Sequence, residues 1–235
     1  MPSIFPYVLV IAIPSIASFV LFSRIKLNSI LQFRDFFWNY AFAFGILSLL
    51  GIPILLINLG VNISQDALIY LYVLTTFSIL ISYLLFFRGT TFLFTQNRFL
   101  TTVLPLIFIP VSAAFSLIAL FYLKMSTIII YTAFLWGFLL VNNNILGVIF
   151  LYSFAQGFPL RVMRGKLCAL LLSLGWFFIL GLDFFLWFVA VLYHPEFWIL
   201  KISSIGGWYL LRSLAYLIIL AGALFCARCR PKAEQ

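Results

Sequence analysis

The sequence predicts an all-α protein, a polytopic transmembrane helix bundle with seven spans, its N-terminus outside and its C-terminus in the cytoplasm. Three observations carry this prediction. Of the 235 residues, 66% are apolar and only 8% are charged, whereas a soluble domain carries about 25% charged residues. The mean hydropathy is +1.22. The apolar residues form long stretches, and the basic residues gather in alternate gaps between them.

This composition excludes several classes of protein. So few charges could not cover a surface in contact with water, which excludes a soluble globular domain, and the apolar content excludes a disordered chain. The 14 basic residues against five acidic ones would suggest a nucleic-acid partner in a soluble protein. In a membrane chain the excess reports topology and attraction to anionic lipid. We therefore expect the lipid bilayer, and no nucleic acid, as a partner.

Seven apolar stretches are long enough to cross a membrane, which takes about 20 residues of helix. They cover residues 5–22, 36–59, 67–87, 99–123, 127–155, 167–193 and 205–225. Strands of a membrane barrel would alternate apolar and polar residues over about ten positions, and these stretches do not. Because no linker or charged block divides the chain, we expect one transmembrane domain over residues 1–235.

The basic residues set the predicted orientation. Eleven of them lie in the gaps after the first, third and fifth stretches and in the C-terminal tail, whereas only Lys124 and Lys201 lie on the opposite side. Short loops rich in lysine and arginine stay in the cytoplasm. One span more or fewer would scatter these charges over both sides, so their distribution also supports the count of seven. We expect a multi-pass protein of the plasma or inner membrane.

Two charged residues fall inside the predicted spans, Asp183 in the sixth and Arg212 in the seventh. A charge at the centre of a bilayer costs about 2.5–3.5 kcal/mol. Both residues lie roughly 12–15 Å below the outer surface, at 1.5 Å of rise per residue, on consecutive antiparallel spans. The sequence therefore predicts a buried ion pair between them.

Aromatic residues share the helix faces of the two charges, and guanidinium groups sit well on aromatic rings. The aromatic residues at helical spacing from the charges are Trp176, Trp187, Trp208 and Tyr216. Two interpretations remain open. The group is either a buried lock that fixes the helix register or the aromatic wall of a ligand or ion pocket.

Three consecutive asparagines, Asn142, Asn143 and Asn144, lie near the middle of the fifth span. They sweep roughly 200° of the helix surface, at 3.6 residues per turn, so they cannot all face one neighbour. One asparagine would suffice for an interhelical hydrogen bond, which contributes about 0.6 kcal/mol on average. Three suggest instead a wet cavity, a local helix break or a polar ligand. Trp136 lies on the face of Asn143 and joins the candidate ligand-binding residues.

The cysteines offer little chemistry. Cys168 lies at the predicted cytoplasmic end of the sixth span, and Cys226 and Cys229 form a C-x-x-C just after the seventh. Three cysteines are too few for a disulfide framework, and no second pair completes a zinc site. We expect reduced thiols without a role, with acylation beside the basic tail as the alternative.

No catalytic constellation is recognisable. The chain has one histidine and five carboxylates, and it lacks the H-E-x-x-H, G-x-S-x-G and P-loop patterns. We therefore predict no enzyme activity, no metal site and no cofactor. In architecture alone, seven helices with the N-terminus outside resemble the membrane sensors of bacterial signalling proteins.

The favoured hypothesis is a receptor-like or sensor-type seven-helix module that binds a small or lipophilic ligand within the bundle, at the candidate residues named above. One alternative is a small transporter or permease component, with a polar path through residues 142–144. The other is a non-catalytic subunit or assembly factor of a membrane complex. The expected partners are accordingly a small-molecule or lipid ligand and a membrane-protein partner.

Overall fold

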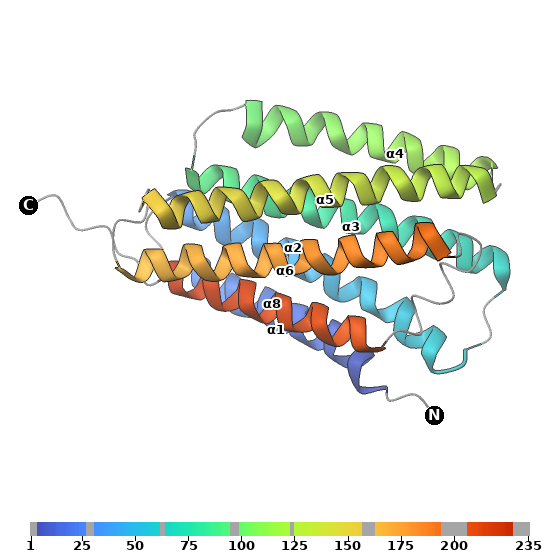
Figure 1. Cartoon of the computed structure of the whole chain (residues 1–235), viewed down its shortest axis with the longest axis horizontal. Coiled ribbons are helices and arrows are strands. Elements are labelled where there is room, and N and C mark those ends of the chain that lie inside the picture. Colours follow the sequence, from blue (N-terminus) through green and yellow to red (C-terminus); the bar gives the residue numbers. More distant parts are fainter. Residues whose placement is uncertain are drawn as a thin grey trace, which may run out of the picture.

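The chain folds into a bundle of long helices. The computed structural model describes residues 4–26, 31–61, 64–94, 99–122, 125–156, 163–193 and 206–227, and these ranges contain no strand. The helices are α1 (Phe5–Ile25), α2 (Leu31–Asn58), α3 (Gln65–Phe94), the π-helical turn η1 (Phe99–Val103), α4 (Leu104–Tyr122), α5 (Met125–Gln156), α6 (Met163–Tyr193) and α8 (Gly206–Ala227). They run side by side along the long axis, and α1 begins at the end opposite to that at which α8 ends (Figure 1).

The predicted helical class is confirmed for the residues that the structure describes. Each of the seven predicted stretches coincides with a helix, and six of these helices, namely α1, α2, α3, α5, α6 and α8, are long and apolar enough to cross a membrane. The remaining predicted stretch, 99–123, falls on η1 and the 19-residue helix α4, which is not among these six helices. The count of seven spans and the orientation of the termini therefore stay predictions.

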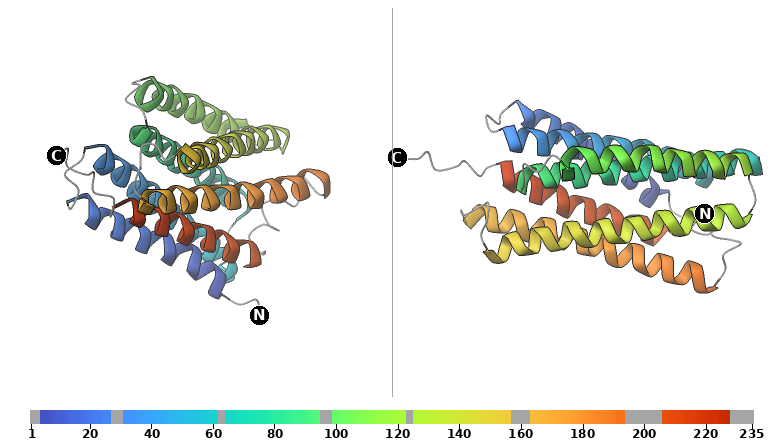
Figure 2. Two further views of the ribbon diagram at one scale, coloured as in Figure 1. Left: turned by 60° about the vertical axis from the view of Figure 1, so that its left-hand side comes forward. Right: turned by 90° about the horizontal axis from the view of Figure 1, so that it is seen from above.

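The bundle closes because its last helix packs against its first. The most extensive contacts join α1 to α2, α2 to α3, α5 to α6, α6 to α8 and α1 to α8. Helix α4 lies at the edge, beside α3 and α5 (Figure 2). The core between the helices is aromatic: the Phe86 ring lies 4.8 Å from Tyr40, 5.0 Å from Phe44 and 5.0 Å from Trp176, between ring centroids.

Glycines let α6 and α8 approach closely. A Cβ atom added at Gly222 would lie 3.0 Å from the backbone nitrogen of Leu172, and one added at Gly175 would lie 3.3 Å from that of Ile219. Small residues allow the backbones of membrane helices to pack against each other. Helices α6 and α8 therefore form a tight antiparallel pair, and this pair carries both of the buried charges.

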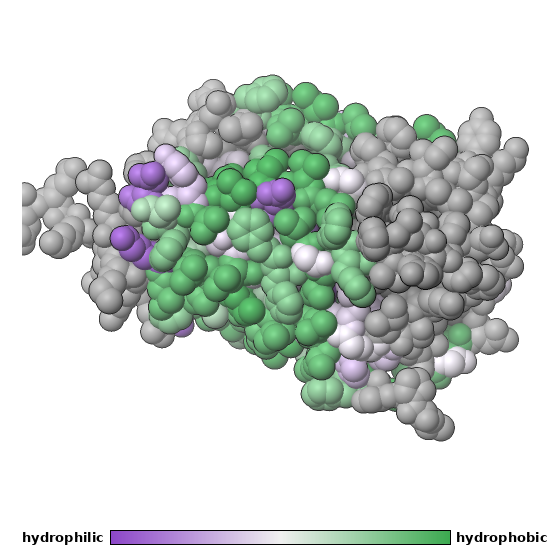
Figure 3. Space-filling view, viewed as in Figure 1, coloured by the Kyte–Doolittle hydropathy of each residue, from purple (hydrophilic) through white to green (hydrophobic). Residues whose placement is uncertain are grey.

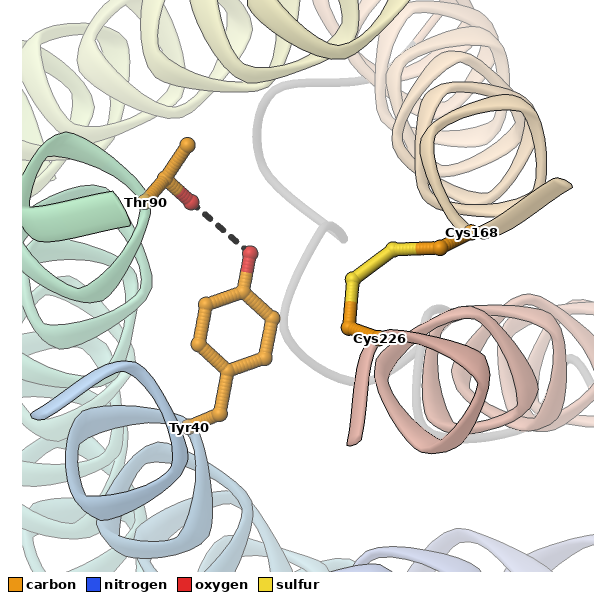
Figure 4. Close-up of a disulfide and its surroundings, with 4 residues drawn as sticks. All are labelled: Tyr40, Thr90, Cys168 and Cys226. Carbon is orange, nitrogen blue, oxygen red and sulfur yellow. Dashed lines mark hydrogen bonds between the residues drawn. A yellow bond between two sulfur atoms is a disulfide. The ribbon is translucent and has the colours of Figure 1, made fainter. Parts of the chain in front are cut away.

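A disulfide between Cys168 and Cys226 joins α6 to α8, with the two Cα atoms 5.4 Å apart (Figure 4). The expectation of reduced thiols is therefore wrong for these two residues, while Cys229 lies outside the described residues. The cysteines are 58 residues apart in sequence, but antiparallel packing brings them to the same end of the bundle. Across from them, the hydroxyls of Tyr40 and Thr90 join α2 to α3 by a 2.8 Å hydrogen bond.

The outer surface of the bundle is largely apolar. Figure 3 shows hydrophobic side chains along the described parts of the helices, with hydrophilic ones gathered where α5 ends and α6 begins. The exposed residues there include Gln156 and Lys166. A soluble protein would bury such a surface, and a contiguous apolar exterior is typical of helices that face lipid.

Candidate functional site

Asp183 on α6 and Arg212 on α8 form the ion pair that the sequence predicts. The Nη1 atom of Arg212 donates a hydrogen bond of 3.0 Å to Oδ1 of Asp183. Asp183 is 0% exposed and Arg212 is 5% exposed, and both lie inside apolar stretches that are long enough to span a membrane. The prediction of a buried pair is confirmed, and the pair fixes α6 against α8.

Three aromatic residues complete the surroundings of the guanidinium. Nε of Arg212 donates to the Tyr216 hydroxyl at 2.8 Å, and Nη2 donates to the Tyr83 hydroxyl at 2.7 Å. The Trp208 ring lies 4.6 Å from Cζ of Arg212, within the range of a cation–π interaction. The sequence predicts Trp208 and Tyr216 by helical spacing. It does not single out Tyr83, because α3 has no spacing relation to α8.

The second carboxylate oxygen of Asp183 connects the pair to α5. Nδ2 of Asn143 donates a 3.1 Å hydrogen bond to Oδ2 of Asp183. We call the resulting group the charged cluster. Its members, from α3, α5, α6 and α8, are Tyr83, Asn143, Asp183, Arg212 and Tyr216. Four helices thus meet at one hydrogen-bonded centre, and α3 is distant in sequence from the other three.

The three asparagines have different surroundings. Asn142 and Asn143 are buried, whereas Asn144 is exposed. Of the three, Asn143 joins the charged cluster through its hydrogen bond to Asp183. Helix α5 is continuous through all three, and the hypothesis of a local helix break is wrong. The helix accommodates them because their side chains point in three directions and leave the backbone hydrogen bonds intact.

Several buried polar atoms near the charged cluster lack a hydrogen-bond partner in the described part of the chain. They include Nδ2 of Asn142, Oδ1 of Asn143, Nε1 of Trp208 and Oγ of Ser213. Most buried polar atoms in proteins are paired, and leaving one unpaired costs about 1–3 kcal/mol. Their residues belong to the charged cluster, adjoin one of its members in the chain or contact its guanidinium, so they leave donors and acceptors there for a polar ligand or water.

The remaining tryptophans differ in their relation to the charged cluster. Trp176 is fully buried and borders the cluster through Tyr83, with the two ring centroids 5.9 Å apart. Trp136 and Trp187 lie on α5 and α6, but their side chains are outside the described residues. Among the described residues, no group of three or more histidine, cysteine or acidic side chains is placed to hold a metal ion.

These features define a class of protein, a multi-pass helical membrane protein whose helices meet at a buried charged cluster. Six described helices have the length and apolar character of membrane spans. No known protein family, characterised protein or solved structure matches the chain. Composition and fold alone therefore support the assignment to this class, and the charged cluster is the feature of the described residues that bears on function.

Proposed function

We propose that the protein is a receptor-like, sensor-type membrane protein that binds a small or lipophilic ligand at the charged cluster. One observation carries this proposal: the ion pair that holds α6 to α8 also binds side chains of α3 and α5. A ligand that replaces Asp183 or Arg212 in the pair changes contacts on four helices at once. We propose a binding role and no catalysis, in a plasma or inner membrane.

The chemistry of the charged cluster suggests which ligand fits. The Arg212 guanidinium, together with the unpartnered N–H groups of Asn142 and Trp208, favours an anionic head group, because carboxylates accept charge-assisted hydrogen bonds from arginine. The apolar helix surfaces around the cluster favour an alkyl chain. A lipophilic carboxylate meets both requirements, and it competes directly with Asp183.

Binding at this position requires the helices to move. Asp183 and Arg212 are both closed off from the surface, so the state that admits a ligand differs from the one described. A ligand shifts such an equilibrium only by its preference for one of the two states. The displacement of α6 from α8 on binding is then the movement that a partner protein reads.

The test uses the purified full-length chain with dodecanoate as the probe and dodecanol as the head-group control. We expect dodecanoate to raise the melting temperature saturably and to change tryptophan fluorescence through Trp208, with a stabilisation of about 1.4 kcal/mol at ten times its Kd. Tyr216→Phe removes one hydroxyl from the charged cluster and should weaken binding. Tyr40→Phe removes a hydroxyl that is bonded elsewhere and should bind as the wild type does.

Two results contradict the proposal. If dodecanol stabilises as well as dodecanoate, the head group is not recognised. If neither compound changes the melting temperature or the fluorescence of any variant, the charged cluster acts only as a lock between helices.

A further inference from the structure

The outward face of α5 carries a regular stripe of exposed residues. The stripe residues are Gly137, Val141, Asn144, Val148, Leu151 and Ala155, all of them exposed. Their positions alternate in steps of four and three, which is the heptad spacing of helices that pair along a left-handed seam. Val141 and Val148, on either side of the asparagine, are 60% and 50% exposed. The bundle leaves this seam uncovered.

Asn144 makes the stripe unsuited to lipid. It is the eighth residue of the 20-residue membrane-spanning stretch Gly137–Gln156, and it has no hydrogen bond to any described residue. Figure 3 shows an isolated hydrophilic spot within the hydrophobic surface of the described part of α5, apart from the hydrophilic end of that helix. Hydrocarbon offers no partner to an amide, so a polar side chain at this depth normally faces protein.

The contacts between α5 and α6 explain why Asn144 stays exposed on the bundle surface. Asn143 bonds Asp183 on α6, and the Gly147 carbonyl accepts a 3.0 Å hydrogen bond from the Ser173 hydroxyl of α6. Helix α6 thus packs on the face of α5 that adjoins the stripe, because Asn143 and Gly147 lie within about 100° of Asn144 around the helix. Rotating α5 to bury Asn144 would break both contacts, so this asparagine needs a partner from outside the bundle.

We propose that the stripe pairs with the same stripe on a second copy of the chain, with Asn144 facing Asn144. Two copies inserted in one orientation place their α5 helices parallel, and a two-fold axis then sets each residue opposite itself. An amide both donates and accepts, so the two side chains satisfy each other. The valines pack around them at the small crossing angle of heptad-paired helices. This inference does not depend on the proposed ligand.

The first test measures association in liposomes. Full-length chains that carry donor or acceptor fluorescent proteins are reconstituted over a range of protein-to-lipid ratios, and energy transfer reports dimerisation. We expect Asn144→Val to weaken dimerisation about tenfold, from the loss of two interhelical hydrogen bonds. Asn144→Gln keeps the amide and should retain most of the association. Because Asn144 is exposed, both variants should fold, which circular dichroism and thermal unfolding check.

The second test measures the register by oxidative cross-linking in membranes. Val148→Cys lies on the stripe and is compared with Leu174→Cys on α6, since the two native side chains are 50% and 52% exposed. The parent chain with its native cysteines gives the background. We expect a cross-linked dimer only from position 148.

The proposal is overturned if the wild-type chain stays monomeric at every ratio, or if Asn144→Val associates as tightly as the wild type. Equal cross-linking from positions 148 and 174 would also overturn it. A cross-link from position 148 to a different protein, with no self-association, would assign the stripe to another partner.

Discussion

Asp183→Asn is the most informative single change, because it preserves the shape of the side chain and removes the charge that compensates Arg212. Arg212 is 5% exposed, so its guanidinium cannot turn to water. Removing one partner of a buried ion pair costs about 3–5 kcal/mol, and a lone charge at mid-bilayer costs about 2.5–3.5 kcal/mol on the insertion scale. Two tyrosine hydroxyls still bond the guanidinium. We therefore expect a loss of about 3 kcal/mol in unfolding free energy.

The assay is reversible unfolding of the purified chain in mixed micelles, followed by circular dichroism, for a double-mutant cycle. Arg212→Met leaves the carboxylate of Asp183 with only the Asn143 amide and should cost a similar amount. The double variant leaves no uncompensated charge, so its loss should be at least about 2 kcal/mol smaller than the sum of the two single losses. An energetic coupling between Asp183 and Arg212 is contradicted if Asp183→Asn stays within about 0.5 kcal/mol of the wild type in unfolding free energy, or if the losses of the two single variants simply add.

Three further predictions concern contacts around the charged cluster. Tyr83→Phe leaves a guanidinium N–H without its acceptor and should lower the unfolding free energy by about 1–3 kcal/mol in the same assay. Gly222→Ala places a Cβ atom 3.0 Å from backbone on α6 and should cost about 1–3 kcal/mol; Gly181→Ala meets nothing within 4 Å and should be neutral or stabilising. In a Cys229→Ser background and under denaturing conditions, Cys168 and Cys226 should resist maleimide labelling until the chain is reduced, as a gel-shift assay can show; labelling before reduction would contradict the disulfide.

Much of the fold follows from the sequence because membrane insertion imposes simple rules. Uninterrupted apolar stretches of span length predict helices wherever the structure has them. Asp183 and Arg212 are predictable as a pair, because two charges at the same depth on consecutive antiparallel helices have few other ways to be compensated. Their helical spacing also places Trp208 and Tyr216 beside the guanidinium.

What the sequence does not predict depends on contacts between helices that are distant in the chain. Tyr83 is one of several hydroxyl-bearing residues on α3, and only the packing of α3 against α8 selects it. The position of Asn143 in a span indicates that its amide needs a hydrogen-bond partner, but nothing in the sequence identifies that partner as Asp183. The sequence does contain an indication of the Cys168–Cys226 disulfide, since both residues lie at the same end of two consecutive predicted spans. The C-x-x-C spacing, in contrast, relates Cys226 to Cys229, which is its neighbour in sequence only.

The disulfide has a mechanical consequence for the two helices that it joins. Counting from Cys168 and Cys226, the ion pair lies about 14–15 residues further along α6 and α8, which is roughly 22 Å at 1.5 Å per residue. While both the disulfide and the ion pair are intact, α6 and α8 move as one rigid body. When the ion pair opens, the disulfide remains as a pivot, and the separation between α6 and α8 increases with distance from the disulfide. A small displacement at the charges is thereby amplified at the far end of the bundle.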